Sequence, residues 1–151
     1  MRDIYLKHAF SIVLLTCLLS WSCSNKTEAY RSGSDNSNTP ITFKNGIAKL
    51  KFGQVGLLDA KDLSLAFTKV TNDSRCPKGL ECIQQGHVLV ELALKKEGKV
   101  IEIFILSDRV EESVKEIGDL VIKLKSVSPY PEFNKKIDVA DYVLLLEKSK
   151  K

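Results

Sequence analysis

Apolar residues recur at every second position over long stretches of this chain, and this period is the feature that most constrains its fold. A period of two places alternate side chains on opposite faces of a strand, one toward a core and the other toward water. The stretches with this period are residues 48–52, 63–67, 88–94 and 120–124. Residues 100–106 and 142–146 are almost continuously apolar, which predicts strands that are covered on both faces.

Turn-forming residues separate these stretches. Asn45-Gly46 follows Ile41-Thr42-Phe43, and both residues of the dipeptide tolerate positive φ, so it predicts a hairpin. Lys96-Glu97-Gly98-Lys99 predicts a second hairpin between two long strands. About seven short strands with polar turns predict an all-β fold, a single antiparallel β-sandwich or barrel-like domain over residues 41–151.

Residues 107–119 depart from the period of two. Ser107 or Asp108 is suited to cap the start of a helix. The apolar residues that follow have helical spacing, namely Val110, Val114 and Ile117. Gly118 ends the stretch early, so the sequence leaves a short helix and an ordered loop both open.

The first residues have the layout of a secretory signal peptide. Arg2 and Lys7 form a positive end, and an apolar run follows over residues 9–19. A spanning helix needs about 20 apolar residues, so this run is too short for a comfortable membrane anchor. We therefore expect residues 1–22 to be a signal peptide that is removed before Cys23.

The stretch Leu19-Ser20-Trp21-Ser22-Cys23 resembles the lipobox of bacterial lipoproteins, whose cysteine receives a diacylglycerol thioether. The resemblance implies a lipid on Cys23 that holds the protein at a membrane. Ordinary signal cleavage is the alternative, because small residues flank Trp21. Residues 23–40 are rich in Ser, Asn, Thr and charge, which predicts a flexible tether after the lipidated cysteine. The expected location is the bacterial cell envelope, facing the periplasm or the cell surface.

Cys76 and Cys82 stand in a turn-rich segment of the tethered domain. Outside the cytoplasm such a pair is expected to form a disulfide, which would stabilise the fold by roughly 2 kcal/mol for so short a loop. His87 follows and would complete a set of three zinc ligands, but a structural zinc site takes four. We favour the disulfide and expect no metal and no cofactor.

Residues 72–86 resemble the signature of a family of small uncharacterised bacterial secreted and lipoprotein β domains. That signature reads Asp-Ser-Arg-Cys-Pro, four residues, Cys, one residue, Trp, one residue, Gly. The matching residues here are Asp73, Ser74, Arg75, Cys76, Pro77, Cys82 and Gly86. Gln84 stands in place of the Trp and cannot supply its stacking face. A second likeness is Pro129-Tyr130-Pro131 followed by Asp141-Tyr142-Val143. The resemblance implies a lipid-anchored or secreted β domain with a disulfide-pinned loop, and it brings no activity with it.

Arg75 and Lys78 form the candidate binding surface, since an exposed Arg beside an acid binds carboxylates or phosphates. The alternative is structural, with Asp73 tying down the backbone of the loop in an Asx-turn. Tyr130 offers a similar choice between a recognition surface and a buried plug, and burial is the commoner fate of a large aromatic side chain.

Catalytic motifs are lacking in this sequence. His87 is the one histidine after residue 22, and there is no Gly-x-Ser-x-Gly elbow and no Gly-rich phosphate loop. The chain has 23 basic and 19 acidic residues, which are intermixed and form no basic stripe for nucleic acid. We expect a non-catalytic binding or interaction module with a protein or small-ligand partner. An envelope-structural or assembly component is the alternative, followed by a small envelope hydrolase.

Overall fold

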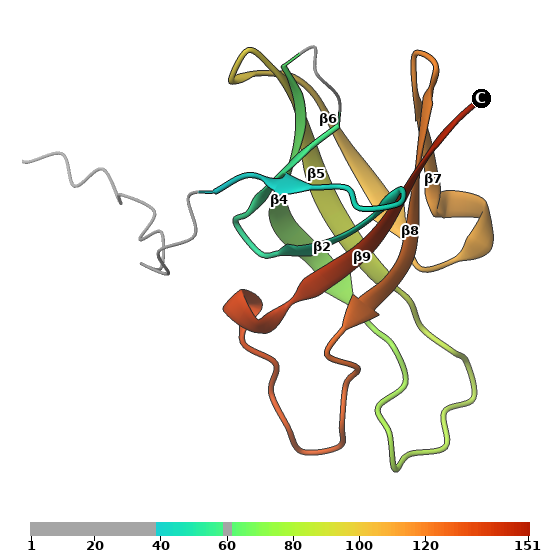
Figure 1. Ribbon diagram of the computed structural model, residues 1–151. Coiled ribbons are helices and arrows are strands. Elements are labelled where there is room, and N and C mark those ends of the chain that lie inside the picture. Colours follow the sequence, from blue (N-terminus) through green and yellow to red (C-terminus); the bar gives the residue numbers. More distant parts are fainter. Residues whose placement is uncertain (1–38, 59–61) are drawn as a thin grey trace, which may run out of the picture. The chain divides into compact units, whose positions relative to one another are not determined.

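The computed structural model describes residues 39–58 and 62–151 (Figure 1). The predicted signal peptide, Cys23 and the tether up to residue 38 lie outside the described residues. No helix within the described ranges is long and apolar enough to cross a membrane.

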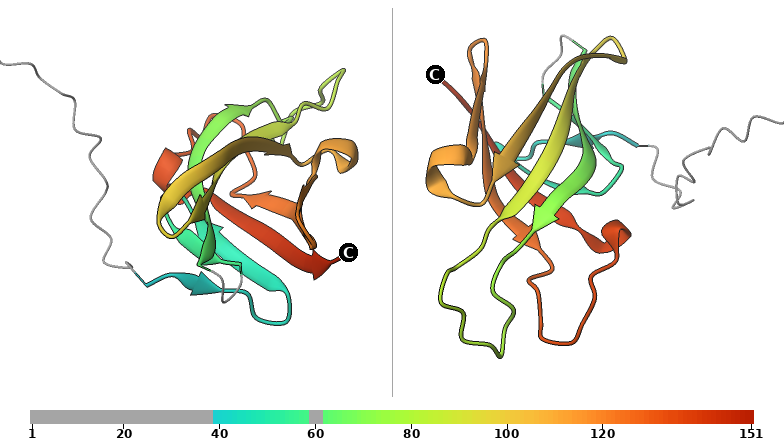
Figure 2. Two further views of the ribbon diagram at one scale, coloured as in Figure 1. Left: turned by 90° about the horizontal axis from the view of Figure 1, so that it is seen from above. Right: turned by 180° about the vertical axis from the view of Figure 1, so that it is seen from behind.

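The described residues form a two-layered β-sandwich, as the alternating pattern predicts (Figures 1 and 2). The strands are β1 (Ile41–Thr42), β2 (Ile47–Lys51), β3 (Val55–Leu57), β4 (Leu63–Asp73), β5 (Val88–Lys96), β6 (Lys99–Ser107), β7 (Val114–Ile117), β8 (Leu120–Ser128) and β9 (Val143–Lys150). Sheet A has the order β1-β3-β4-β5-β6, and sheet B has the order β2-β9-β8-β7. Two short 3₁₀-helices, η2 (Val110–Glu112) and η3 (Val139–Asp141), lie in the connections.

The core lies between the two sheets and consists of the inward members of the alternating stretches. On β5, for example, Val88, Val90 and Leu92 are fully buried, whereas Leu89 and Glu91 are half-buried. The other strands contribute in the same way, and the largest fully buried side chains include Leu50, Leu65, Phe67, Leu106, Ile122, Leu144 and Leu146. The period of two in the sequence therefore identifies the core correctly.

The two predicted turns form, but only one of them makes the expected hairpin. Glu97 and Gly98 have positive φ and connect β5 to its neighbour β6. Asn45 and Gly46 also have positive φ, and a single bridge pairs Lys44 with the residue after the turn. The strands on either side then diverge, because β1 pairs in parallel with β3 in sheet A and β2 pairs with β9 in sheet B.

Residues 107–119 contain a short 3₁₀-helix and a strand, whereas the sequence left open a short helix or an ordered loop. The 3₁₀-helix η2 is followed directly by β7, which pairs with β8. Gly118, with φ of 59°, lies in the two-residue turn between these strands, so it ends a strand and not a helix. The helical spacing of Val110 and Val114 is therefore misleading, and these residues belong to different elements.

The prediction that residues 100–106 are covered on both faces is wrong. They lie in β6, the edge strand of sheet A, and only Phe104 and Leu106 of this run are buried. A continuous apolar run has the same appearance in a doubly covered strand and in an edge strand with an apolar outer face, which is why the sequence misleads here. On β9 the buried Leu144 and Leu146 alternate with the half-buried Val143 and Leu145.

Candidate functional site

Two long loops extend side by side from one end of the sandwich, and we call them the apical loops (Figure 1). The first, residues 74–87, joins β4 to β5, and the second, residues 129–142, joins β8 to β9. Backbone hydrogen bonds connect them, since Lys78 N donates to Pro131 O over 2.9 Å and Phe133 N donates to Lys78 O over 3.2 Å. The two loops are thus held together as one unit.

The first apical loop is closed at its tip by a disulfide and at its base by a close backbone approach. Cys76 and Cys82 form the disulfide, as the cysteine spacing predicts, with their Cα atoms 6.0 Å apart. At the base, Ser74 N donates to His87 O over 2.9 Å. Gly86 packs against this base so tightly that a Cβ atom would lie 1.7 Å from Ser74 O. A residue with a side chain would therefore clash at position 86, which explains the glycine at this position of the family-like signature.

Arg75 is buried, which corrects the prediction that it forms an exposed binding surface. Its exposed fraction is 5%, and its guanidinium is fully engaged inside the protein. Nε donates to Asp73 Oδ1 over 2.8 Å, and one terminal nitrogen lies 2.5 Å from Asp73 Oδ2. Further bonds run to Val127 O (2.7 Å) and Pro129 O (3.0 Å). The bidentate ion pair with the carboxylate provides hydrogen-bond partners for the guanidinium. These bonds offset the cost of removing its charge from water.

The structural alternative for Asp73 is therefore confirmed. Its Oδ1 accepts a 3.3 Å hydrogen bond from Arg75 N, the bond of an Asx-turn, and Tyr142 donates its hydroxyl to Oδ2 over 2.9 Å. Asp73, Arg75 and Tyr142 form a polar cluster that joins the end of β4 to the start of β9 and to the second apical loop. Sequence reasoning missed the role of Tyr142, although it lies in the second family-like motif.

The electrostatics of this cluster favour a charged Asp73, a charged Arg75 and a neutral Tyr142. Burial opposes ionisation of Asp73, but hydrogen bonds from Arg75 and Tyr142 and the positive charge of Arg75 outweigh it and lower the pKa of the carboxyl. Burial and the hydrogen bond to the Asp73 carboxylate raise the pKa of Tyr142 to about 12. The cluster is internally neutral and leaves no charge to recruit a ligand.

Tyr130 lies between the two predicted binding residues. Its ring centroid is 5.0 Å from the Arg75 guanidinium carbon and 5.8 Å from Lys78 Nζ, so it makes cation–π contacts with both. Tyr130 is exposed, so it is not the buried plug that its size favoured, although its ring lies over the buried Arg75 guanidinium. Lys78 is exposed, so one of the two predicted residues is accessible at the surface.

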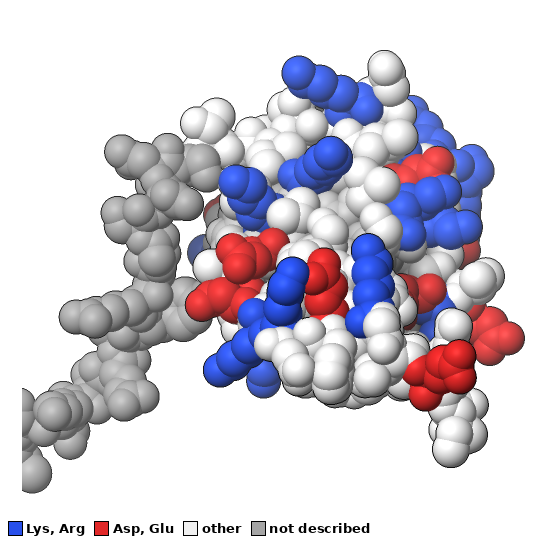
Figure 3. Space-filling view, turned by 90° about the horizontal axis from the view of Figure 1, so that it is seen from below, with Lys and Arg blue, Asp and Glu red and all other residues white. Residues whose placement is uncertain are grey.

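Four large apolar side chains on the apical loops are exposed and were not singled out from the sequence: Leu80, Ile83, Phe133 and Val139. Ile83 is fully exposed and stands next to Gln84, the residue at the Trp position of the family-like signature. Figure 3 looks onto this end of the domain and shows acidic and basic side chains intermixed around uncharged surface.

The zinc site considered from the sequence is not formed in residues 39–58 and 62–151. No group of three or more His, Cys, Asp or Glu side chains there is positioned to hold a metal ion. Both cysteine sulfurs considered as zinc ligands are engaged in the disulfide. His87 Nδ1 is buried and has no hydrogen-bond partner among the described residues.

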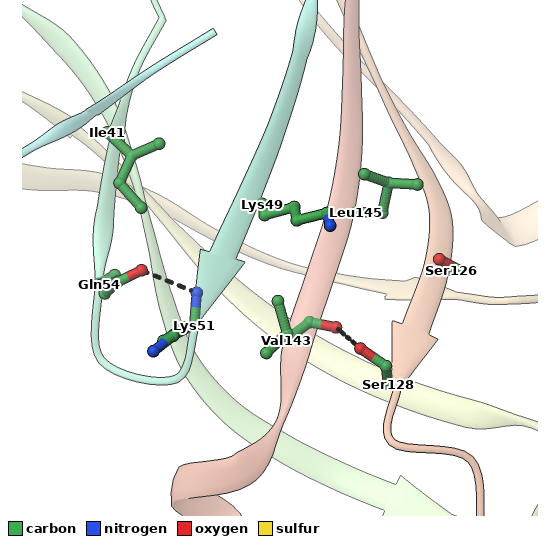
Figure 4. A pocket seen from close by; sticks show the side chains of 8 residues that line it. All are labelled: Ile41, Lys49, Lys51, Gln54, Ser126, Ser128, Val143 and Leu145. Carbon is green, nitrogen blue, oxygen red and sulfur yellow. Dashed lines mark hydrogen bonds between the residues drawn. The ribbon is translucent and has the colours of Figure 1, made fainter.

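A hollow of about 580 Å³ lies on the outer face of sheet B (Figure 4). Its floor is formed by apolar side chains of Ile41, Val143 and Leu145, and its sides carry Lys49 and Lys51 of β2. Gln54 and, from β8, Ser126 and Ser128 also line it, and the Ser128 hydroxyl donates to Val143 O over 3.3 Å. The hollow is open to solvent, and it contains none of the candidate binding residues proposed from the sequence.

A run of exposed apolar side chains lies on β6. Val100, Ile101, Ile103 and Ile105 are each at least half exposed. Ile103 lies opposite Ala93 of β5, which in turn lies opposite Ala66 of β4, but both alanines are buried, so the exposed apolar row does not continue across these positions. The far edge of β6 makes no backbone hydrogen bond to any of the described residues. Within the described part of the chain, the peptide groups that point away from β5 are therefore available to pair with another strand.

The other three edge strands of the sandwich show how unusual β6 is. The edge strands β1, β2 and β7 have two, five and four residues, whereas β6 has nine. Folded proteins usually protect sheet edges by keeping them short or charged, because a long apolar edge is a template for further pairing.

Comparisons with protein-family models, curated proteins and solved structures find no match to this chain. The β6 edge is therefore the candidate functional surface on physical grounds alone.

Proposed function

We propose that this chain is a non-catalytic protein-interaction module, held at the bacterial cell envelope by a lipid on Cys23. The observation that carries the proposal is the free edge of β6, where unpaired peptide groups run alongside exposed isoleucines. An extended segment of a partner protein can add to such an edge as a further strand. Main-chain hydrogen bonds then supply affinity, and alternate side chains supply specificity.

The polar features of the domain support a protein partner over a small ligand. The cluster of Asp73, Arg75 and Tyr142 is buried and spends its hydrogen bonds within the protein. A small-ligand site normally combines a concave surface with a few convergent polar groups that remain available. Exposed apolar surface of the β6 kind marks protein interaction sites instead.

Site-specific photo-crosslinking in living bacteria tests this function. A photoreactive amino acid at Ile105 of β6 should give adducts of higher mass in the envelope. The same amino acid at Thr71, an exposed position of β4 in the same sheet, is the matched control. Adducts at position 105 and not at 71 support the proposal, and equal or absent crosslinking at the two positions contradicts it.

The membrane anchor is tested separately by Cys23→Ser. We expect the wild-type chain to fractionate with membranes and its N-terminal peptide to carry added acyl mass, because the lipobox-like motif places Cys23 at the start of the mature protein. The Cys23→Ser variant should be released or left unprocessed. A wild-type N-terminal peptide without acyl mass would show that ordinary signal cleavage occurs instead.

A further inference from the structure

We propose that β6 pairs with β6 of a second copy of this chain, in an antiparallel arrangement about a two-fold axis at Ile103. The inference rests on the proposed function, because it assigns a partner to the same edge. Such pairing would join the two five-stranded A sheets into one continuous sheet. A two-fold contact uses the same patch on both copies, so the patch must complement itself.

The side chains of β6 meet that requirement. Isoleucines stand at 101, 103 and 105, symmetrically about the central residue. With the axis at Ile103, Ile103 faces its own equivalent and Ile101 faces Ile105 of the second copy. Directly opposed side chains of antiparallel strands have Cβ atoms about 4.5–5.5 Å apart, close enough for apolar contact. All three exposed isoleucines of each copy are then covered in a single ladder.

The charges of β6 are compatible with the same register. Glu102 is the one acidic residue within the strand, and it forms an ion pair with Lys115 of its own chain. Lys99 at the start of β6 would lie opposite Ser107 of the second copy, next to Asp108. A parallel arrangement would instead bring Lys99 beside its own equivalent. Antiparallel pairing is therefore favoured by charge as well as by the apolar pattern.

The strand also has the backbone needed for this contact. β6 contains no proline, and eight of its nine residues pair with β5, the exception being Ile101 at a bulge. The bulge lies toward the N-terminal end of the strand, so the segment over residues 102–107 is regular. A regular strand with a free edge offers an evenly spaced set of donors and acceptors to its equivalent.

Cysteine crosslinking of the full-length chain in the bacterial envelope tests the register. Ile103→Cys places two thiols directly opposite each other, within the reach of a disulfide. Ile101→Cys alone and Ile105→Cys alone place the equivalent thiols four residues apart, roughly 13 Å, which a disulfide cannot bridge. Co-expression of these two single variants brings unlike thiols together. The wild-type chain, oxidised in the same way, reports any crosslinking through its own cysteines.

We expect Ile103→Cys to give a reducible dimer as its main oxidised product, and the Ile101→Cys and Ile105→Cys variants to give it only when they are co-expressed. Equal dimer yields for all single variants would contradict this register. If no variant forms a dimer but the photo-crosslinker at position 105 captures a protein of another mass, self-pairing is wrong and the proposed function stands. If neither method gives a product, both proposals fail.

Discussion

Tyr142 donates a 2.9 Å hydrogen bond to the carboxylate of Asp73, 69 residues earlier in the chain. The bond joins β4 of sheet A to the segment that enters β9 of sheet B, and Arg75 completes the cluster. The signature-like segment of the first apical loop therefore has a structural role. It fixes the two loops to the end of the sandwich.

Arg75→Ala should lower the free energy of unfolding by about 3 kcal/mol or more, because it leaves the Asp73 carboxylate buried without its partner. Lys78→Ala should change it by less than about 0.5 kcal/mol, since Lys78 is exposed. Urea unfolding of the two single variants measures both values. A stable, folded Arg75→Ala variant would show that the cluster contributes little to stability.

Stability should fall at acid pH through Asp73. Because the folded-state pKa of Asp73 is lowered, its contribution is fully present above the unfolded pKa of about 4 and is lost as the pH falls through the folded value. Asp73→Asn should be less stable than wild type at pH 7 and should lose less stability on acidification. Parallel slopes of unfolding free energy against pH between pH 2 and 5 would contradict this assignment.

Tyr142 should produce the opposite effect at alkaline pH. Its folded-state pKa is raised to about 12 from an ordinary value of 10.0, so the folded state holds the proton more tightly. Stability should therefore decline between pH 10 and pH 12, and Tyr142→Phe should remove this part of the decline. Ultraviolet titration of the phenolic groups checks the pKa directly. A Tyr142 that ionises at its ordinary pH would contradict the hydrogen bond to Asp73.

Much of the fold could be predicted because the core strands alternate. On β5 and β8 the buried positions, such as Val90 and Ile122, are the ones that the period of two identifies. The sequence could not show that Val100–Leu106 is an edge, because burial of the outer face depends on which strand comes next in the sheet. It also could not show that β7 replaces a helix, since Val110 and Val114 satisfy a helical spacing by coincidence.

The candidate site was harder to predict than the fold. Arg75 looks exposed in a polar loop, and its burial depends on Val127 O and Pro129 O, which lie more than 50 residues away. A charged residue in a turn carries no local signal of such distant acceptors. The disulfide was predictable because Cys76 and Cys82 are close in sequence, whereas the β6 surface depends on strand order.

Gly86→Ala should destabilise the first apical loop. The added Cβ would lie 1.7 Å from Ser74 O, a backbone atom that cannot rotate away. We expect a loss of about 1–3 kcal/mol, as for other overpacked sites, with faster amide exchange at the Ser74–His87 base of the loop. Gln85→Ala, at the exposed neighbouring position, is the control and should be nearly neutral. Unchanged amide exchange in Gly86→Ala would show that the loop base accommodates the added Cβ atom, and it would contradict this prediction.

Ile103 and Phe104 are consecutive residues of β6 that face opposite ways, and substituting each one tests whether the outer face is free in the monomer. Phe104 is buried, so Phe104→Ala should lower the free energy of unfolding by about 3 kcal/mol or more. Ile103 is 60% exposed, so Ile103→Lys should change the stability of the monomer by less than about 0.5 kcal/mol.

The two variants should also differ in self-association. Ile103→Lys places two positive charges opposite each other at the proposed axis, so it should abolish the dimer that we expect sedimentation to show for the wild type. Because a dimer adds stability that rises with concentration, unfolding must be measured at several protein concentrations. Wild-type stability should rise with concentration, and that of Ile103→Lys should not. If Ile103→Lys lowers the free energy of unfolding by several kcal/mol at the lowest protein concentration, Ile103 belongs to the core of the single domain. That result would contradict the proposal that the β6 edge is a docking surface.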